Sequence, residues 1–306
     1  MPRDSKDTDY SQFIDFKQEI TNCYVCGSDN LYFLKKVNGF SVVRCKKCKL
    51  IWIGDAINEE KLKSFYDSDY YTNFYVERTG YKDYVGHEYN YRKNSRNNIN
   101  IVSKVKKIDF LRVLDIGCAC GFYIDEIKRL KNCDVYGVDF SKWAIKYGTD
   151  TLNLKNIYYQ EKENHFDFES SYFDVVFILG TIEHVTSPRE MLAEVYRMLK
   201  PDGIIMITTL DTKSLVPLYL IKPPEHLFYF NHNNLPILLR SMGFKTLINE
   251  PYFSHYYVFE ILQILSNFQF LKFLAPISRL IYKLFSRLSF KSPSNEMAIV
   301  AQKKME

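Results

Sequence analysis

Apolar runs of strand length alternate with helix-like segments along the second part of the chain, from residue 111 onward. This alternation predicts a largely parallel sheet covered by helices, because each parallel connection needs a crossover element. The predicted strands are 111–115, 134–138, 156–159, 173–179, 203–209, 245–251 and 296–302. The predicted helices are 122–131, 141–150, 188–199 and 233–242. The fold class is therefore α/β, with seven strands.

The segment 256–292 interrupts this alternation, because it is strongly apolar over most of its length. Helical spacing places its apolar positions on one face, at Ile277, Leu280, Ile281, Leu284 and Leu288. Basic residues recur every fourth position, at Arg279, Lys283 and Arg287. This pattern predicts a basic amphipathic helix. We favour packing of this helix on the domain or on a partner subunit. The alternative is contact of 277–291 with a membrane surface or a lipid-linked substrate.

The first 110 residues do not follow the alternating pattern. Residues 1–20 are polar and are expected to form a loosely held arm. Residues 58–110 are predicted to form a helical cap rich in tyrosine and basic side chains. Such a cap could bind nucleic acid, but we favour a solvated helix face beside a cofactor cleft. The predicted units are thus the arm, a cysteine-rich segment at 21–57, the cap, and an α/β domain at 111–306.

Length and charge narrow the class of protein further. A chain of 306 residues can hold one large α/β domain and a small additional part. The net charge of +5 is mild and gives no argument for nucleic acid as a partner. The first residues lack an apolar signal core, and no uncharged stretch reaches the length of a membrane span. We expect a cytoplasmic protein, or one held peripherally at the inner face of a membrane, of unknown oligomeric state.

Four of the seven cysteines form two pairs, each with two residues between its members. In a protein expected to be cytoplasmic, this pattern indicates a metal site rather than disulfides. Two such pairs can supply the four thiolates of a tetrahedral zinc ion, which leaves no position open for a substrate. We expect a structural zinc ribbon whose ligands are Cys23, Cys26, Cys45 and Cys48.

The strand at 111–115 ends in Asp115 and is followed by Gly117 and Gly121 before the next helix. The following strand ends in Asp139, 24 residues after Asp115. A strand, a glycine turn, a helix and a second strand that ends in an acid form half of a nucleotide-binding unit. The glycines permit a tight turn and close approach of a ligand.

The spacing Asp-x-Gly-x-Ala-x-Gly resembles motif I of class I S-adenosylmethionine-dependent methyltransferases, which have a Rossmann-like seven-stranded sheet. "VYGVDFSKWAIKYG", the Ile-Glu-His-Val loop and the Leu-Lys-Pro-Asp-Gly turn are also similar to that family. Ala119 departs from the pattern, since the family usually has a glycine there. The resemblance implies that S-adenosylmethionine is bound by Asp115, Gly117, Gly121, Asp139, Glu161, Leu179 and Gly180. The resemblance also implies that Asp139 accepts hydrogen bonds from the ribose hydroxyls and that Glu161 binds the edge of the adenine ring.

Methyl transfer to a hydroxyl group, or to a carbon beside a carbonyl, also needs a general base. The family geometry implies that His184 and His226 lie near the acceptor, where a neutral imidazole can take a proton. His184 could equally be a structural hydrogen-bonding residue, whereas for His226 we favour a catalytic or substrate-binding role over a structural one. Secondary candidates are Glu183, Glu225, Tyr229, His87 and Arg92.

The cysteine pairs followed by "LKSFYDSDYY" resemble a subgroup with an N-terminal zinc-binding region, often associated with tailoring of sugars and glycans. This resemblance implies a small-molecule acceptor, such as a sugar, a nucleotide-sugar or a lipid-linked glycan. One alternative is an RNA methyltransferase that uses the zinc ribbon to hold nucleic acid. Another is a catalytically silent binding protein of the same fold, which Ala119 alone favours.

Overall fold

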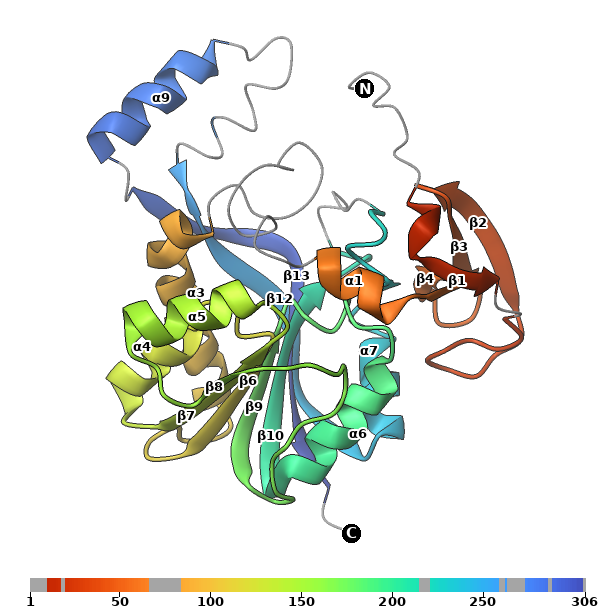
Figure 1. Ribbon diagram of the computed structural model, residues 1–306, viewed down its shortest axis with the longest axis horizontal. Coiled ribbons are helices and arrows are strands. Elements are labelled where there is room, and N and C mark those ends of the chain that lie inside the picture. The colour runs from red at the N-terminus through yellow and green to blue at the C-terminus, as the bar shows by residue number, and fades with distance from the viewer. Residues whose placement is uncertain are drawn as a thin grey trace.

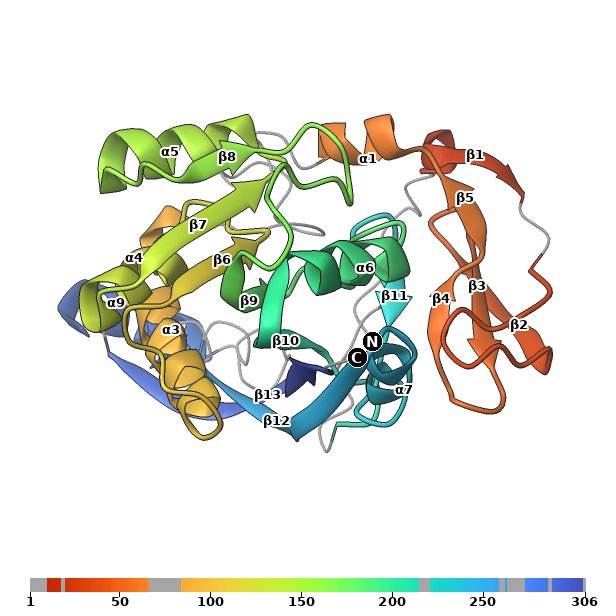
Figure 2. The same ribbon diagram turned by 90° about the horizontal axis from the view of Figure 1, so that it is seen from below.

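The computed structural model describes residues 10–17, 20–65, 84–214, 221–258, 262, 273–285 and 288–304. Within these residues, a large sheet lies between two groups of helices (Figure 1). A smaller sheet that carries the cysteine pairs lies beside it (Figure 2). The predicted polar arm begins outside the described residues. Its later part forms a short strand, β1 (Ile14–Lys17), which pairs with β5 (Asp55–Ile57).

The large sheet has seven strands in the order β12-β13-β10-β9-β6-β7-β8. Each predicted strand is confirmed, and β13 alone runs antiparallel to its two neighbours in this sheet. The strands are β6 (Arg112–Ile116), β7 (Asp134–Asp139), β8 (Ile157–Tyr159), β9 (Phe173–Leu179), β10 (Leu199–Leu210), β12 (Phe244–Tyr257) and β13 (Ser289–Lys303). β6 pairs with both β7 and β9, so the strand order reverses at β6. In open α/β sheets, a ligand crevice forms at such a reversal.

The central strands are apolar on both faces, as strands covered on both sides must be. On β9, Val175 and Phe177 pack into the core beneath the helices α3 to α5. The intervening Val176 and Ile178 pack into the core beneath α6 and α7. Successive side chains of a strand point to opposite faces, so one apolar run fills both layers. The helices are α3 (Glu88–Ser103), α4 (Phe122–Lys131), α5 (Lys142–Leu152), α6 (Pro188–Met198) and α7 (Leu235–Ser241).

Two strands are much longer than the sequence predicts. β12 reaches Tyr257 and β13 begins at Ser289, so the two form an antiparallel ribbon that extends beyond the sheet. The predicted insert is therefore partly strand. The reason is that its buried positions include the polar Ser254 while Phe253 is exposed, so no apolar alternation marks the strand in the sequence. A helix, α9 (Leu274–Phe285), lies beyond the end of the ribbon (Figure 1).

The predicted helical cap is described at its two ends, by α1 (Glu59–Phe65) and by the turn η2 (Val85–His87) followed by α3. The part between residues 65 and 84 lies outside the described residues. On α3, Arg92 pairs with Glu88, Asp125 and Glu126, and Arg96 also pairs with Glu126. The side chain of Glu126 is 2% exposed. The basic side chains of α3 thus hold it against α4, which agrees with a packed helix rather than a nucleic-acid-binding surface.

The small sheet has the strand order β11-β4-β3-β2. Three of its strands come from the cysteine-rich segment: β2 (Leu31–Val37), β3 (Phe40–Cys45) and β4 (Ile51–Ile53). The fourth, β11 (Phe228–Tyr229), follows β10 by 17 residues in the chain and pairs with β4. The cysteine-rich segment therefore shares a sheet with the large α/β unit. A two-residue strand has no periodicity, so the sequence gives no sign of it.

Arg189 at the start of α6 joins the two parts. Its guanidinium donates hydrogen bonds to the carbonyl oxygens of Tyr24, at 2.9 Å, and Val25, at 3.2 Å. Its backbone N–H donates to the Tyr24 hydroxyl at 2.9 Å. One charged side chain therefore satisfies two main-chain acceptors of the first cysteine turn.

We expect Arg189→Ala to lower the free energy of unfolding by about 2 kcal/mol, because hydrogen bonds from a charged donor are lost. Urea unfolding of the intact chain measures this loss. Arg240→Ala, which removes an exposed arginine from α7, is the matched control and should change the free energy little. Equal losses in the two variants would contradict the role of Arg189.

Candidate active site

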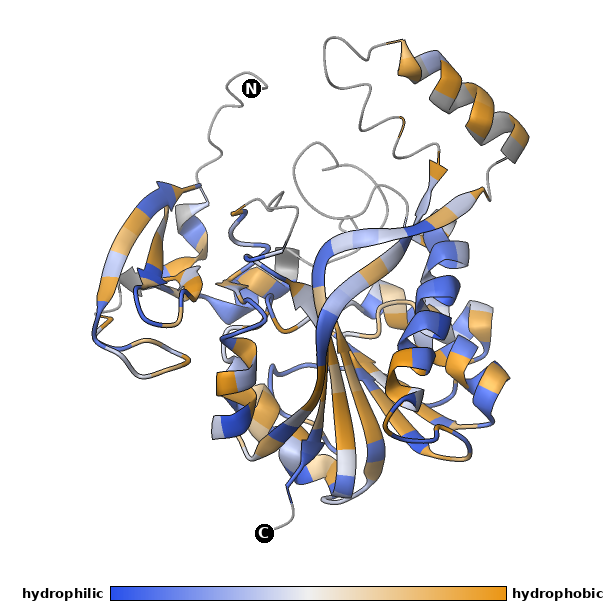
Figure 3. Cartoon of the chain, turned by 180° about the vertical axis from the view of Figure 1, so that it is seen from behind, coloured by the Kyte–Doolittle hydropathy of each residue, from blue (hydrophilic) through white to orange (hydrophobic). Residues whose placement is uncertain are grey.

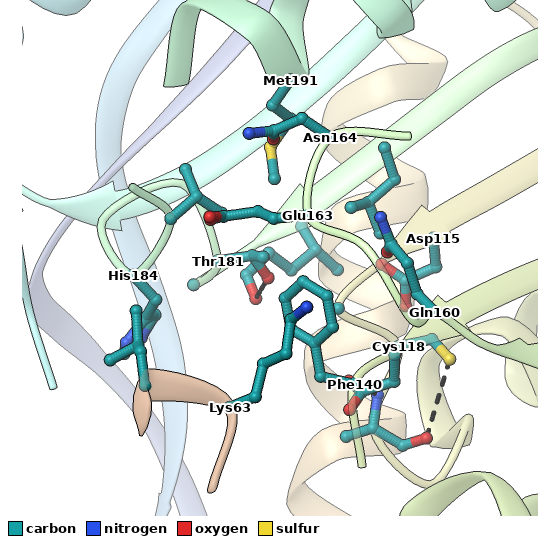
Figure 4. A pocket seen from close by; sticks show the side chains of 18 of the residues that line it. Lys63, Asp115, Cys118, Phe140, Gln160, Glu163, Asn164, Thr181, His184 and Met191 are labelled. Carbon is teal, nitrogen blue, oxygen red and sulfur yellow. Dashed lines mark hydrogen bonds between the residues drawn. The ribbon is translucent and has the colours of Figure 1, made fainter. Parts of the chain in front are cut away.

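The candidate site lies at the carboxyl ends of β6, β7 and β9, at the reversal of strand order. Side chains from the two ends of the cap also line it. Leu62 and Lys63 come from α1, Tyr84 from the residue before η2, and Tyr91 from α3. Six of the residues predicted from the sequence line the pocket: Asp115, Gly117, Asp139, Leu179, Gly180 and His184. Figure 4 shows Asp115, Cys118 and Gln160 toward one end of the pocket and His184 toward the other.

The glycine turn after β6 has three residues with positive φ: Gly117 at 78°, Ala119 at 48° and Gly121 at 82°. A Cβ atom on Gly117 would collide with the side chain of Thr181. One on Gly121 would lie 2.5 Å from Cδ1 of Leu154. Gly121 caps α4 and does not line the pocket, so its role here is close packing of the turn.

Ala119 replaces the usual middle glycine without opening the turn. It adopts the left-handed conformation at a cost of about 1–2 kcal/mol. Its N–H donates to Oδ2 of Asp139 at 2.8 Å, and Ser141 N–H donates to Oδ1 at 2.8 Å. The acid at the end of β7 therefore holds the turn closed. Each carboxylate oxygen can accept more than one hydrogen bond, so Asp139 keeps acceptor capacity toward the pocket.

Asp115 is 2% exposed, and its Oδ1 has no hydrogen-bond partner among the described residues. Burial, together with the negative charge of Asp139, raises the pKa of Asp115 well above its ordinary value. A buried carboxylate with an unused oxygen is costly unless a donor or a cation meets it. This end of the pocket is thus suited to a ligand that carries a positive charge and hydroxyl groups.

The segment after β8 corrects one expected position. The side chain of Glu161 is exposed and does not line the pocket, whereas Gln160, Glu163 and Asn164 do. The prediction missed by one residue because consecutive side chains in an extended segment point to opposite sides. Burial raises the pKa of Glu163 to about 7, and the carboxylate accepts a hydrogen bond from Thr186 N–H at 2.7 Å.

The two predicted histidines lie together at the other end. The ring centroids of His184 and His226 are 4.6 Å apart, in an edge-to-face arrangement. His184 Nδ1 is bonded to the carbonyl oxygen of Glu225. Burial lowers the pKa of His184 to about 4, and burial with the nearby His184 lowers that of His226 well below its ordinary value. Both imidazoles are therefore neutral near pH 7, and Nδ1 of His226 has no partner among the described residues.

Glu183 lies beside the histidines. A carboxylate oxygen of Glu183, a ring nitrogen of His184 and a ring nitrogen of His226 all lie within 4.8 Å of one another. Burial raises the pKa of Glu183 to about 7, and its Oε2 has no partner among the described residues. The carbonyl oxygen of Glu183 accepts hydrogen bonds from Leu227 and Phe228 N–H, at 2.8 and 3.1 Å. These main-chain bonds join the loop that carries His184 to the loop that carries His226.

The secondary candidates serve mainly structural roles. The Tyr229 hydroxyl donates to the carbonyl oxygen of His226 and accepts from Lys222 N–H. Arg92 is held by three carboxylates, those of Glu88, Asp125 and Glu126. His87 lies against Tyr91 and Tyr257. Glu225 lies behind the histidines, where its carboxylate pairs with Lys222 at 2.8 Å.

The four paired cysteines converge at a second site, outside this pocket. Their sulfur atoms all lie within 4.8 Å of one another, with Cys23 to Cys48 at 3.5 Å and Cys26 to Cys45 at 3.7 Å. Tetrahedral zinc with bonds of about 2.3 Å requires sulfur separations close to these. Each pair lies in a similar turn: Gly27 N–H bonds to the carbonyl of Cys23, and Lys49 N–H to that of Cys45. The cysteines form no disulfides, and the cluster is compatible with zinc.

Comparisons with known proteins agree with this geometry. A family model described as a methyltransferase domain matches residues 77–248, which is more than half of the chain. The mitochondrial ubiquinone biosynthesis O-methyltransferase of Dictyostelium discoideum is 29% identical over 134 residues, 40% of this chain and 42% of the relative. The sterol 24-C-methyltransferase of Schizosaccharomyces pombe is 29% identical over 98 residues, 30% of this chain and 26% of the relative. The chain thus spans less than half the length of these relatives.

Among solved structures, a methyltransferase complexed with an activator protein from Haloferax volcanii has a TM-score of 0.50 and 11% identity. The match covers 70% of this chain and 94% of that one, and it shows a shared fold. The names of the two sequence relatives refer to ubiquinone and sterol, and neither supports the expected sugar acceptor. The chain belongs to the methyltransferase domain family.

Proposed function

We propose that the chain transfers a methyl group from S-adenosylmethionine to a hydroxyl group of a small, largely apolar molecule. One observation carries this proposal. A single pocket has a buried, unsatisfied carboxylate of Asp115 toward one end and the neutral imidazole of His184, backed by His226, at the other. The first end suits the charged cofactor, and the second suits an acceptor that must lose a proton.

In this proposal, Asp115 meets the methionyl ammonium group and Asp139 accepts hydrogen bonds from the ribose. Gln160 takes the place of Glu161 at the adenine edge, since its side chain lines the pocket. The loop at Leu179 and Gly180 forms the floor toward the histidines, and a Cβ on Gly180 would meet nothing within 4 Å. When bound, S-adenosylmethionine supplies a methyl group on a sulfonium that is a good leaving group. The protein's contribution is mainly alignment and exclusion of water.

We assign the general base to His184, because its imidazole lines the pocket, whereas His226 is not among the lining residues. His226 and Glu183 are its positioning neighbours, because main-chain bonds at Glu183 and Glu225 fix both loops. Burial lowers the pKa of His184 to about 4 and keeps the imidazole neutral, so the base is ready near pH 7. Because its pKa is lowered, this imidazole is a weaker base than a solvated histidine.

The acceptor class rests on the lining of the pocket and on the relatives. Leu62, Val185 and Met191 line the pocket together with aromatic rings from the cap, which suits an apolar ring or chain. The names of the two relatives refer to ubiquinone and sterol, which are hydrophobic molecules. An RNA acceptor is the second candidate, but it loses support because Arg92 and Arg96 are committed to ion pairs.

We also propose that Cys23, Cys26, Cys45 and Cys48 hold one structural zinc ion. The cluster lies beside the small sheet, away from the pocket, and four thiolates leave no open coordination position. The ion would fix both turns, including the one that Arg189 contacts.

We expect Gly117→Ala to weaken S-adenosylmethionine binding at least about tenfold, because the new methyl group collides with Thr181 in a left-handed turn. Isothermal titration calorimetry measures this change. Gly117→Ala with Thr181→Ala should recover part of the loss. Gly27→Ala is the matched control, since Gly27 has φ 67° but open space at Cβ. Unchanged affinity in Gly117→Ala would contradict the assigned cofactor position.

We expect His184→Ala to lower kcat by about a hundredfold or more while cofactor affinity stays unchanged. The assay measures methylation of a prenylated dihydroxybenzene, with a nucleotide-sugar and an RNA as competing acceptors. His165→Ala, at an exposed histidine, is the control. A preference for the nucleotide-sugar or the RNA would overturn the acceptor class, and a normal kcat in His184→Ala would overturn the assignment of the base.

The pH dependence follows from the neutral state of the base. A base with a lowered pKa remains active at neutral pH and loses activity as pH falls through that pKa. We therefore expect kcat/KM to stay level down to pH 6.5, the ordinary pKa of histidine, and to decline only below it. A decline that begins above this value would contradict the burial of His184.

We expect purified protein to contain about one zinc per chain, measured by elemental mass spectrometry. Cys45→Ser should remove the zinc and lower the thermal unfolding temperature, because the site couples to folding. Cys133→Ser changes a buried cysteine outside the cluster and should keep the metal. Metal-free protein that unfolds at the same temperature would show that the cluster needs no ion.

A further inference from the structure

The helix α9 exposes an apolar face. Ile277 is 41% exposed, Leu280 55% and Leu284 63%, and these positions lie along one side of the helix. Figure 3 shows hydrophobic positions along a helix that projects from the rest of the protein. The expectation that this helix packs on the domain or on a partner subunit stays a prediction. A run of exposed apolar side chains marks an interaction surface.

The segment that contains this face is basic in sequence. Residues 256–292 contain five lysines and arginines and one glutamate, which gives +4 of the chain's total of +5. On α9, helical spacing places the positions of Arg279 and Lys283 one turn apart and beside the position of Leu280. A basic band beside an apolar stripe is complementary to an anionic lipid surface, where headgroups meet the charge and acyl chains meet the stripe.

The ribbon of β12 and β13, beyond which α9 lies, is at the same edge of the sheet as the pocket. β12 and β10 both run antiparallel to β13, so they run parallel to each other. The end of β12 at Tyr257, paired with Ser289 of β13, therefore lies toward the carboxyl edge of the sheet that holds the pocket. The Tyr257 hydroxyl contacts the carbonyl of Gly86, two residues from Tyr84 of the pocket lining. Figure 1 shows α9 beyond this end of the sheet.

We propose that α9 lies on an anionic membrane surface, with Ile277, Leu280 and Leu284 in the acyl boundary and the basic positions at the headgroups. Among the described residues, no helix is long and apolar enough to cross a membrane, and α9 has 12 residues. It therefore lies along the surface. Docked in this way, the edge of the sheet that holds the pocket faces the bilayer, where an apolar acceptor is concentrated.

The test measures sedimentation of the full chain with vesicles, in the absence of cofactor and acceptor, so it is independent of the proposed methyl transfer. We expect binding to vesicles of phosphatidylcholine mixed with phosphatidylglycerol, weakened by salt, and little binding to pure phosphatidylcholine. The double variant Arg279→Glu/Lys283→Glu should lower the partition coefficient by about tenfold or more. The double variant Leu280→Glu/Leu284→Glu should do the same through lost apolar burial, again by about tenfold.

A matched control comes from α4, where Lys128 and Leu130 are also exposed. Lys128→Glu/Leu130→Glu changes the net charge by about −3, between the charge changes of the two α9 variants, and should bind vesicles like the unaltered chain. Circular dichroism and the unfolding temperature show that each variant is folded. Equal binding to neutral vesicles, or none to either kind, overturns the proposal. So does a dimer in sedimentation that Leu280→Glu/Leu284→Glu dissociates without loss of vesicle binding, because the face would then join two copies.

Discussion

The carbonyl oxygen of Glu183, which accepts the N–H groups of Leu227 and Phe228, is the contact on which the active site most depends. It joins the loop after β9, which lines the pocket, to the loop that carries His226. Phe228 also belongs to β11, which pairs with β4 of the cysteine-rich sheet. The carbonyl oxygen of one residue thus connects the loop that lines the pocket, the loop that carries His226 and the sheet beside the paired cysteines. Because these bonds are between backbone atoms, they tolerate changes in side chains nearby.

Electrostatics divides the pocket into two environments. At one end, Asp115 and Asp139 place two carboxyl groups in a buried space, which is costly until a cation is present. At the other, burial keeps His184 and His226 neutral and raises the pKa of Glu183. Pairs of groups whose environments push their pKa values in different directions are typical of enzyme sites. In the proposed function, this arrangement separates cofactor binding from proton removal.

Local pattern predicted most of the framework. All seven strands of the sheet and the helices around it follow from periodicity, since covered strands and amphipathic helices must repeat at fixed intervals. The glycine turn was also readable, because Gly117 meets the side chain of Thr181 and tolerates no Cβ. Strand ends were harder to place: the buried positions of the β12–β13 ribbon include the polar Ser254, so its period is not an apolar one. The side chain of Glu161 is exposed and that of Gln160 lines the pocket, because a one-residue offset reverses the side of an extended chain.

The sequence by itself determined the elements, the tight turn and the pairing of cysteines, since each depends on residues close together in the chain. Only the tertiary structure decided which distant residues meet. His184 and His226 are 42 positions apart, and β11 lies far from β4 in the chain. Such contacts depend on strand order and loop path, which no local spacing encodes. The same holds for α9: its pattern showed two faces, but only the fold determined that the apolar face is exposed.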